Sequence, residues 1–416
     1  MKSSSLVFTV FTVTAASFAL AAGVRAQQPA AVRAFTGARL IDGTDRAPVT
    51  NATIVVRDGR IVAAGAAVTV PAGAERVALA GKTVIPGLIN THGHVNTRDR
   101  DLKTYAAYGV TTVFSLGGEE APHFAARDSQ NTPSLNRARI FVAGPVLAPA
   151  TPAEAREQVA KVQALKVDLV KIRVDDNLGT TPKMTPEVYR AVIDEAHKRG
   201  MRVAAHLFYL QDAKGLLDAG ADFIAHSVRD ADISPDVITQ LKSRGICVCP
   251  TLMREVSTFV YASTPDFFAD PFFLKHADVK QVADLKTPAS QEAMRKSPAA
   301  QRYKAGLEVA SRNLKKLSDN GIMIAMGTDT GPVGRFQGFF ELKELELMAK
   351  AGLTPKQVLQ AATRDAARCW KVDRDLGTIE AGKWADFVVL DADPLVDIAN
   401  TQRISDVYIA GNRVSR

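Results

Sequence analysis

The chain has 416 residues, of which 46% are hydrophobic and 23% are charged, and its formal net charge is +8. This composition excludes extended disorder and predicts a globular protein with a large core. The lysines and arginines are spread along the chain and do not form blocks, which favours a solvated basic surface over a nucleic-acid groove.

Residues 1–26 have the three parts of a secretory signal peptide. Lys2 supplies positive charge, residues 6–22 are largely apolar, and a Val-Arg-Ala cleavage site precedes Gln27. A membrane anchor is the alternative, but the apolar run contains Thr and Ser and is short for a span of about 20 apolar residues. We therefore expect cleavage after Ala26 and an exported mature protein, periplasmic or secreted, without stable membrane insertion.

Both ends of the mature chain consist of short β-rich runs with turn signals between them. In residues 27–83 the pair Asp58-Gly59 separates two such runs and indicates a hairpin. Residues 377–416 have the same pattern, for example at 386–390 and 407–414. We expect the two ends to build one small composite β-sandwich.

Residues 84–376 instead alternate apolar runs with amphipathic helical stretches, which is typical of parallel strands covered by helices. Helices are expected, for example, at 152–166, 186–199 and 235–244. Eight β/α units predict an α/β fold with a closed (β/α)8 TIM-like barrel. The eight runs are 84–90, 110–116, 139–144, 169–174, 202–206, 223–226, 246–250 and 322–329.

About fifty residues, 253–301, separate the seventh run from the helix that precedes the eighth. Loops of that length inside a compact domain are usually functional. The segment contains five phenylalanines, so it is either an apolar lid over the barrel mouth or a packed insertion. The three cysteines are too few for a disulfide framework, and we expect Cys247 and Cys249, two apart in an apolar run, to be buried thiols.

Four of the seven histidines occur where barrel strands are expected to end. His92 and His94 are two apart, so their side chains can point the same way from the first strand, and Gly93 leaves room between them. His206 ends the fifth run and His226 the sixth, and active sites of such barrels lie at these ends. Each one alone could be a core histidine, but their convergence predicts a metal site.

Two further side chains are candidates for the same site. Asp329 follows a nearly pure apolar run and could bind metal and accept a proton from bound water, with a helix N-cap as the alternative. Lys171 lies inside the fourth strand, where burial and nearby cations would lower its pKa. A neutral amine there can capture carbon dioxide and become a carbamate that bridges two metals. Arg173 has the same parity as Lys171 and can reach the cavity.

These motifs resemble the amidohydrolase superfamily, within the group similar to imidazolonepropionase and the prolidase-like metallodipeptidases. The likeness extends over nearly the whole mature chain. It includes Gly-Leu-Thr-Pro at 352–355, Ala-Ala-Thr at 361–363 and the closing signature at 376–390.

The resemblance implies a two-metal hydrolase. The implied metal ligands are His92, His94, Lys171, His206, His226 and Asp329. The first two histidines and the aspartate, which is also the base, would hold one ion and the other two histidines the second, with carboxylated Lys171 and a hydroxide bridging them. Zinc is favoured, and manganese or cobalt would also suit these ligands.

The resemblance implies cleavage of an amide bond in a small molecule such as a dipeptide or an N-acyl amino acid. The alternative is a one-metal hydrolase that opens a cyclic amide or lactam, as imidazolonepropionase-like enzymes do. Those relatives carry an acid shortly after the fifth-strand histidine, whereas Leu207, Phe208 and Tyr209 follow His206 here. A silent scaffold would have lost ligands, and none of the six is lost. A homo-oligomer is compatible with the sequence.

Substrate contacts are expected from Tyr209 and Arg173. Tyr209 resembles a residue that contacts the substrate carboxylate in the dipeptidase group, with a packed aromatic as the alternative. The chain departs from that group after the third strand, where residues 144–152 contain no histidine in place of the usual Gly-Gly-His element. Recognition of a free carboxy-terminus therefore does not follow from the resemblance.

Overall fold

The computed structural model of this chain describes residues 32–414. The expected signal peptide lies outside the described residues, so it stays a prediction. Among the described helices, none combines the length and the apolar character that a membrane span requires.

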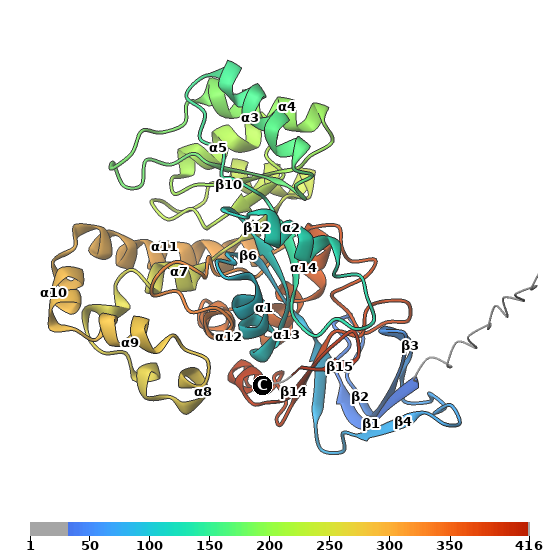
Figure 1. The fold of residues 1–416 in the computed structure, drawn as a ribbon. Helices are drawn as coiled ribbons and strands as arrows, with labels where there is room; N and C mark the ends of the chain where they lie inside the picture. Colours follow the sequence, from blue (N-terminus) through green and yellow to red (C-terminus); the bar gives the residue numbers. More distant parts are fainter. Residues whose placement is uncertain (1–31, 415–416) are drawn as a thin grey trace, which may run out of the picture. The chain divides into compact units, whose positions relative to one another are not determined.

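The two ends of the chain meet in one eight-stranded mixed sheet, in which β5 joins the amino-terminal strands β1–β4 (blue) to the carboxy-terminal strands β13–β15 (red) (Figure 1). The strand order is β15-β14-β13-β5-β1-β2-β3, with β4 paired to β1. The predicted hairpin is confirmed, because Arg57 pairs with Arg60 across Asp58-Gly59, both of which have positive φ. The strands are β1 Val32–Leu40, β2 Val49–Arg57, β3 Arg60–Gly65, β4 Glu75–Ala78, β5 Thr83–Pro86, β13 Phe387–Leu390, β14 Ile404–Ile409 and β15 Asn412–Arg413.

This sheet has its own apolar core, which includes Phe35, Phe387 and Tyr408 in mutual ring contact. The expected sandwich is not divided into two separate sheets within residues 32–414, because hydrogen bonds link all eight strands in one sheet. The expected first barrel run, 84–90, is corrected. Its first half belongs to β5 of the chain-end sheet and its second half begins β6, with Gly87 between them.

The middle of the chain contains two parallel sheets, in keeping with a TIM-barrel-type α/β fold. One has the order β12-β11-β10-β9 and the other β6-β7-β8. Isolated parallel bridges continue the pairing at their edges, joining Leu147 to Ile172, Val248 to Ile324 and Gly93 to Thr330. The strands are β6 Leu88–Gly93, β7 Val110–Ser115, β8 Arg139–Val142, β9 Val170–Arg173, β10 Val203–His206, β11 Phe223–Ala225 and β12 Cys247–Cys249.

The eighth expected strand, 322–329, is corrected as well. Among the described residues this segment forms no regular strand and is held by isolated bridges and single backbone bonds, such as Ala325 N–H to Val248 O at 3.0 Å. Asp329, the last residue of this segment, has a positive φ, and so do His226 after β11 and Thr251 after β12. Residues other than glycine normally avoid this conformation. Such irregular backbone is common where side chains are aimed into a functional site.

Helices follow the strands and pack against one another in sequence, α3 with α4, α4 with α5 and α5 with α6. The predicted helices are confirmed, since proline stands at the first helical position of each and Thr151 caps the first by accepting a bond from Glu154 N–H. The main helices are α1 Arg98–Ala107, α2 Ala121–Asp128, α3 Pro152–Ala164, α4 Pro186–Lys198, α5 Leu210–Ala219, α6 Pro235–Arg244, α11 Pro298–Asp319, α12 Phe339–Lys350, α13 Pro355–Ala361 and α14 Arg364–Cys369, with the 3-10 turn η3 Ile398–Gln402.

The long segment after β12 is helical and packed. Its Phe267, Phe268 and Phe273 form a network of ring contacts with Phe336 and Phe339 from the region after Asp329. This favours the packed insertion over a loose lid. The elements are α7 Leu252–Val256, η1 Val260–Ala262, η2 Asp266–Ala269, α8 Pro271–Leu274, α9 Val279–Leu285 and α10 Pro288–Lys296.

A disulfide joins Cys247, the first residue of β12, to Cys369 at the end of α14. The expectation of a free thiol at Cys247 is therefore wrong, whereas Cys249 is a buried free thiol as expected. The partner cysteine is 122 residues away, and only the fold brings the two Cα atoms to 5.9 Å.

Candidate metal centre

His92 and His94 come from the end of β6 and approach the same carboxylate. His92 Nε2 lies 3.4 Å and His94 Nε2 3.0 Å from Asp329 Oδ1. The His94 Nδ1–H can donate to the carbonyl of Gly117 at 3.2 Å, which leaves Nε2 as the nitrogen with a free lone pair. A Cβ on Gly93 would lie 2.7 Å from Asn90 and Tyr105, so glycine is required between the two histidines.

His206 and His226 approach from the ends of β10 and β11. His226 is fully buried and its Nδ1 lies 2.7 Å from the Thr251 hydroxyl, which orients Nε2 away from the backbone. The rings of His206 and His226 are 4.2 Å apart, and that of His226 is 4.5 Å from His92. His206 Nε2 contacts Asp175 at 2.8 Å. Asp175 is not among the residues predicted from the sequence, although it shares the parity of Lys171 and Arg173.

Asp329 is buried between the histidines and two arginines. Its backbone N–H donates to His92 O at 2.6 Å, Oδ1 faces the two histidines, and Oδ2 accepts a bond from Arg335. Burial alone would raise the pKa of this carboxyl, but Arg335, His92 and His94 hold its pKa well below the usual range. The balance of these effects favours the ionised form of the Asp329 carboxyl.

Lys171 is the only predicted ligand with an amine, and it lies within β9 with 3% of its surface exposed. Its Nζ is 3.1 Å from His92 Nε2. Burial lowers the pKa of Lys171 to about 8, so the neutral amine is far more accessible near neutral pH than it is for an exposed lysine. A buried amine that need not carry charge is the chemical requirement for reaction with carbon dioxide.

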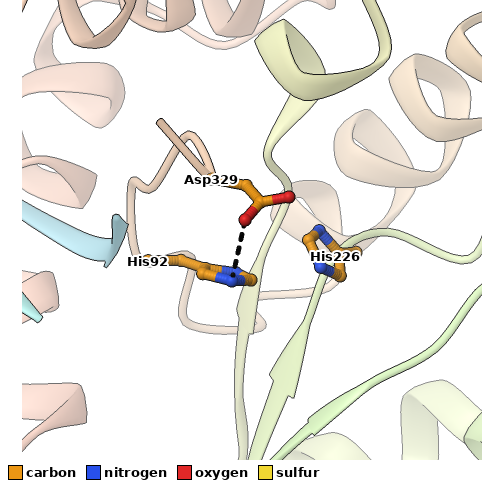
Figure 2. Close-up of side chains that lie close together, drawn as sticks. All are labelled: His92, His226 and Asp329. Carbon is orange, nitrogen blue, oxygen red and sulfur yellow. Dashed lines mark ion pairs between the residues drawn. The ribbon is translucent and has the colours of Figure 1, made fainter. Parts of the chain in front are cut away.

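The six predicted ligands thus form one continuous cluster, because each side chain contacts at least one other member of the set. Figure 2 shows its centre, where Asp329 is paired with His92 and the ring of His226 stands opposite. The ligand atoms of these three residues lie within 4.8 Å of one another. In residues 32–414, His92 Nδ1 and His226 Nε2 are buried without a hydrogen-bond partner. It is Nε2 of His92 that approaches Asp329, at 3.4 Å from Oδ1. Buried imidazoles gathered around a carboxylate in this way fit a divalent cation.

A buried network holds this cluster and was not found from the sequence. Glu341 of α12 accepts bonds from Asn90 at 2.6 Å and from the hydroxyls of Thr328 and Thr330 at 2.7 and 2.6 Å. Asn90 in turn accepts the His92 N–H at 2.9 Å. The network ties the end of β6 to the segment that carries Asp329. No spacing rule links residue 341 to residue 90, so only the fold reveals it.

The two predicted substrate contacts are both engaged with acids. Arg173 Nε donates to Asp175 Oδ1 at 3.2 Å, and its side chain is 39% exposed. The Tyr209 hydroxyl donates to Asp176 at 2.8 Å, and Lys183 Nζ lies 3.9 Å from the centre of its ring. Their role in binding substrate stays a prediction.

The metal-free protein should lose stability as the pH falls from about 6.5 to about 4. Burial lowers the pKa of His206 to about 4, and it lowers the pKa values of His92 and His226 well below the usual range. As the pH falls, these histidines therefore bind protons in the unfolded chain before they do so in the folded chain. The free energy of unfolding therefore decreases as the pH falls, and His206 alone should lower it by about 2 kcal/mol at pH 5. Urea unfolding of chelator-treated protein at pH 7.5 and pH 5 measures this.

The His206→Asn variant is the control for that experiment, since it keeps an amide near Asp175 but has no imidazole to titrate. Its stability should change less between the two pH values than that of the wild type. Equal changes in both proteins would contradict the assignment of the effect to His206.

Buried imidazoles at the C-terminal ends of parallel strands, beside a carboxylate and a buried lysine, are typical of metal-dependent hydrolases of the TIM-barrel type. The profile of the Amidohydrolase family matches residues 83–414, and the chain belongs to this family. The resemblance expected from the sequence is confirmed. The protein is an enzyme of the class that hydrolyses carbon–nitrogen bonds, and the family generally uses divalent metals.

Alignments with related proteins extend over most of the chain at low sequence identity. An imidazolonepropionase of Mycolicibacterium smegmatis is 23% identical over 359 residues, which cover 84% of this chain and 86% of the relative. The crystal structure of a candidate prolidase from Bifidobacterium longum matches with a TM-score of 0.76 at 26% identity, covering 94% of this chain and 96% of the other. A Xaa-Pro dipeptidase with bound methionine matches with a TM-score of 0.74 at 22% identity, covering 93% and 100%. The last likeness shows the fold alone.

Proposed function

We propose that this chain is an exported two-metal amidohydrolase that cleaves the amide bond of a small molecule such as a dipeptide or an N-acyl amino acid. The observation that carries the proposal is the place of Lys171, a buried amine 3.1 Å from His92 within a cluster of four histidines and one aspartate. A one-metal site has no need of an amine there. The likeness to a candidate prolidase and to a Xaa-Pro dipeptidase agrees with this substrate class.

The residues divide into two sets of ligands. His92, His94 and Asp329 would hold one cation and His206 and His226 the other, with zinc favoured over manganese or cobalt. Two divalent cations in such a site supply Lewis-acid chemistry, because they acidify water and polarise the scissile carbonyl.

Lys171 would join the two sets as a carbamate. The neutral amine forms an N–C bond with carbon dioxide and releases one proton to solvent, which turns a buried base into an anion. The low pKa of about 8 supports this step, because the ammonium form has no lone pair to react. The product carries a carboxylate at the end of the lysine stem, among the histidines.

Asp329 would move the proton during hydrolysis. Its carboxylate, held as an anion, would accept a proton from the attacking water and donate it to the nitrogen of the leaving amine. The Glu341 network would keep the carboxylate in place by fixing the neighbouring Thr328 and Thr330.

We also propose that residues 84–376 form a closed barrel and that residues 27–83 and 377–416 form the composite sandwich. The bridges at Leu147, Ile324 and Thr330 support closure, since they link the edges of the two parallel sheets. The boundary between residues 83 and 84 falls inside β5, so the connection between the two parts is a shared strand.

Export is supported by the disulfide as well as by the signal-like amino terminus. Structural disulfides persist in oxidising compartments and are rare in the cytosol. Protein recovered from outside the cytoplasm should have the intact mass of a chain that begins at Gln27. A mass that still includes residues 1–26 contradicts export with cleavage.

Purified enzyme should hydrolyse L-alanyl-L-leucine or N-acetyl-L-leucine, with release of a free amine that ninhydrin detects. Chelation of the metal should abolish at least 99% of this activity, and added zinc, manganese or cobalt should restore it, because the cations polarise the carbonyl. Absence of hydrolysis across a panel of dipeptides and N-acyl amino acids, in metal-replete protein, would contradict the proposal.

The second candidate function is the opening of a cyclic amide at a one-metal site. The curated relatives that favour it are imidazolonepropionases, at 23% identity over 359 and 401 residues. A panel of five-membered cyclic amides and lactams tests it in the same assay. Turnover of a cyclic amide with none of the linear amides would put this function first.

A further inference from the structure

Arg254 is a buried cation with an unused donor beside the metal centre. It lies in α7, directly after β12, and only 7% of its side chain is exposed. Its Nη1 donates to Glu255 at 3.0 Å, Nη2 lies 3.3 Å from the Tyr303 hydroxyl, and its guanidinium stacks 4.3 Å from the Tyr303 ring. The Nε–H has no hydrogen-bond partner within the described chain and lies 3.7 Å from Asp329 Oδ2.

Arg335 reaches the same oxygen from the other side. It lies in the loop after Asp329, its Nη1 donates to Asp329 Oδ2, and its Nε donates to the Ser257 hydroxyl at 3.1 Å. Its side chain is 16% exposed, so it is also partly open to solvent. Two guanidinium groups therefore converge on the outer oxygen of a single carboxylate.

Guanidinium groups outnumber carboxylates around the outer oxygen of Asp329. Three guanidinium groups, those of Arg229, Arg254 and Arg335, face two carboxylates, Glu255 and Asp329. Glu255 is already shared by Arg229 and Arg254. Asp329 is shared by Arg254, Arg335 and the two histidines, so the two arginines have less than one full carboxylate between them at this point. Buried cations of this kind require another anion.

We propose that Arg254 and Arg335 bind the carboxylate of the substrate, so that the enzyme selects amides whose leaving amine is an amino acid with a free carboxyl group. This rests on the proposed amide hydrolysis at the same site. A guanidinium presents parallel N–H donors that match a carboxylate, and the two arginines stand beside the proton-transferring Asp329. They would supply the anion contact for which residues 144–152 provide no histidine.

The test compares N-acetyl-L-leucine with N-(3-methylbutyl)acetamide, which has the same alkyl group and the same single amide but no carboxylate. Release of the amine gives kcat/KM for each. The wild type should prefer the acid by at least 100-fold. Arg335→Gln should lower the ratio of kcat/KM for the acid to kcat/KM for the neutral amide about 10- to 100-fold, mostly through KM for the acid, while the lost contact with Asp329 should lower kcat for both substrates alike. Arg335→Lys should recover part of the loss.

Arg254→Lys is the second variant, and it keeps a cation beside Glu255 so that the fold survives. Arg413→Gln is the matched control, because Arg413 is an exposed arginine on β15 that is paired with Asp406. It should retain the wild-type preference. A folded Arg335→Gln enzyme with an unchanged ratio of acid to neutral amide would overturn the proposal, as would a wild type without preference.

A binding measurement separates this proposal from the proposed function. Calorimetric titration of zinc-loaded protein with 4-methylpentanoate and with 4-methylpentanamide needs no turnover. The acid should bind at least tenfold more weakly to Arg335→Gln than to the wild type, while the amide should bind both equally. If no amide is hydrolysed but this difference is found, the amidase function fails and the carboxylate site stands. Equal binding of the acid to both proteins overturns the carboxylate site.

Discussion

Replacement of Asp329 by asparagine should reduce kcat about 1000-fold and change KM by less than about threefold. The amide has nearly the same shape as the carboxylate but cannot accept a proton, and general acid–base catalysis typically contributes 10²–10⁴-fold. Because the asparagine side chain does not titrate, no pH within the working range should restore the activity of the variant.

Steady-state kinetics on the amide substrate, with metal content measured in the same samples, checks this prediction. Asp232→Asn is the matched control, because Asp232 is an exposed aspartate paired with Arg312 at 3.2 Å. The control should stay within twofold of the wild type. An Asp329→Asn enzyme within tenfold of the wild-type kcat would show that another group moves the proton.

Loss of the Cys247–Cys369 disulfide should lower the free energy of unfolding by about 3–5 kcal/mol. The bond closes a segment with a sequence separation of 122 residues, and chain-entropy arguments assign about 5 kcal/mol to a loop of that length. The Cys247→Ser variant, compared with the wild type by urea unfolding without reductant, measures the effect. Dithiothreitol should destabilise the wild type and leave the variant unchanged.

Cys249→Ser is the control for this comparison, because Cys249 is buried but outside the disulfide. Its stability should still respond to reductant. Thiol titration of denatured wild-type protein should find one free cysteine before reduction and three after it. Three free thiols before reduction would contradict the disulfide, and would also remove its support for export.

The members of the metal cluster could be predicted because each obeys a local rule. His92 and His94 share a strand face by parity, and His206 and His226 each end an apolar run. Lys171 stands out as a charge inside an apolar strand. In parallel barrels, such positions gather at one end of the sheet, so a few strands define the site without knowledge of distant contacts.

The residues that support and surround the cluster could not be predicted in the same way. Glu341, Arg335 and Arg254 lie on helices and loops whose path depends on the packing of the long insertion. Cys369 finds Cys247 only because α14 ends beside β12. The segment 322–329 reads as an ordinary strand, yet the irregular backbone that aims Asp329 at the histidines breaks its pairing.

The chain-end sheet was predictable in outline for a related reason. Alternating apolar residues and the Asp58-Gly59 turn define strands locally, but they do not determine which strands pair. The pairing of β5 with both β1 and β13 unites the ends of the chain, and it assigns Val84 and Ile85 to this sheet instead of to the barrel.

The central claim is that Lys171 joins two metal ions in one site, and elemental analysis of metal per chain tests it most directly. Wild-type and Lys171→Ala proteins should be purified without chelator, with Lys286→Ala as a control on the insertion surface. We expect two ions per chain in the wild type and the control, and one or none in Lys171→Ala, together with loss of amide hydrolysis. A single ion per chain that is unaffected by Lys171→Ala would contradict the two-metal site and favour the one-metal opening of cyclic amides.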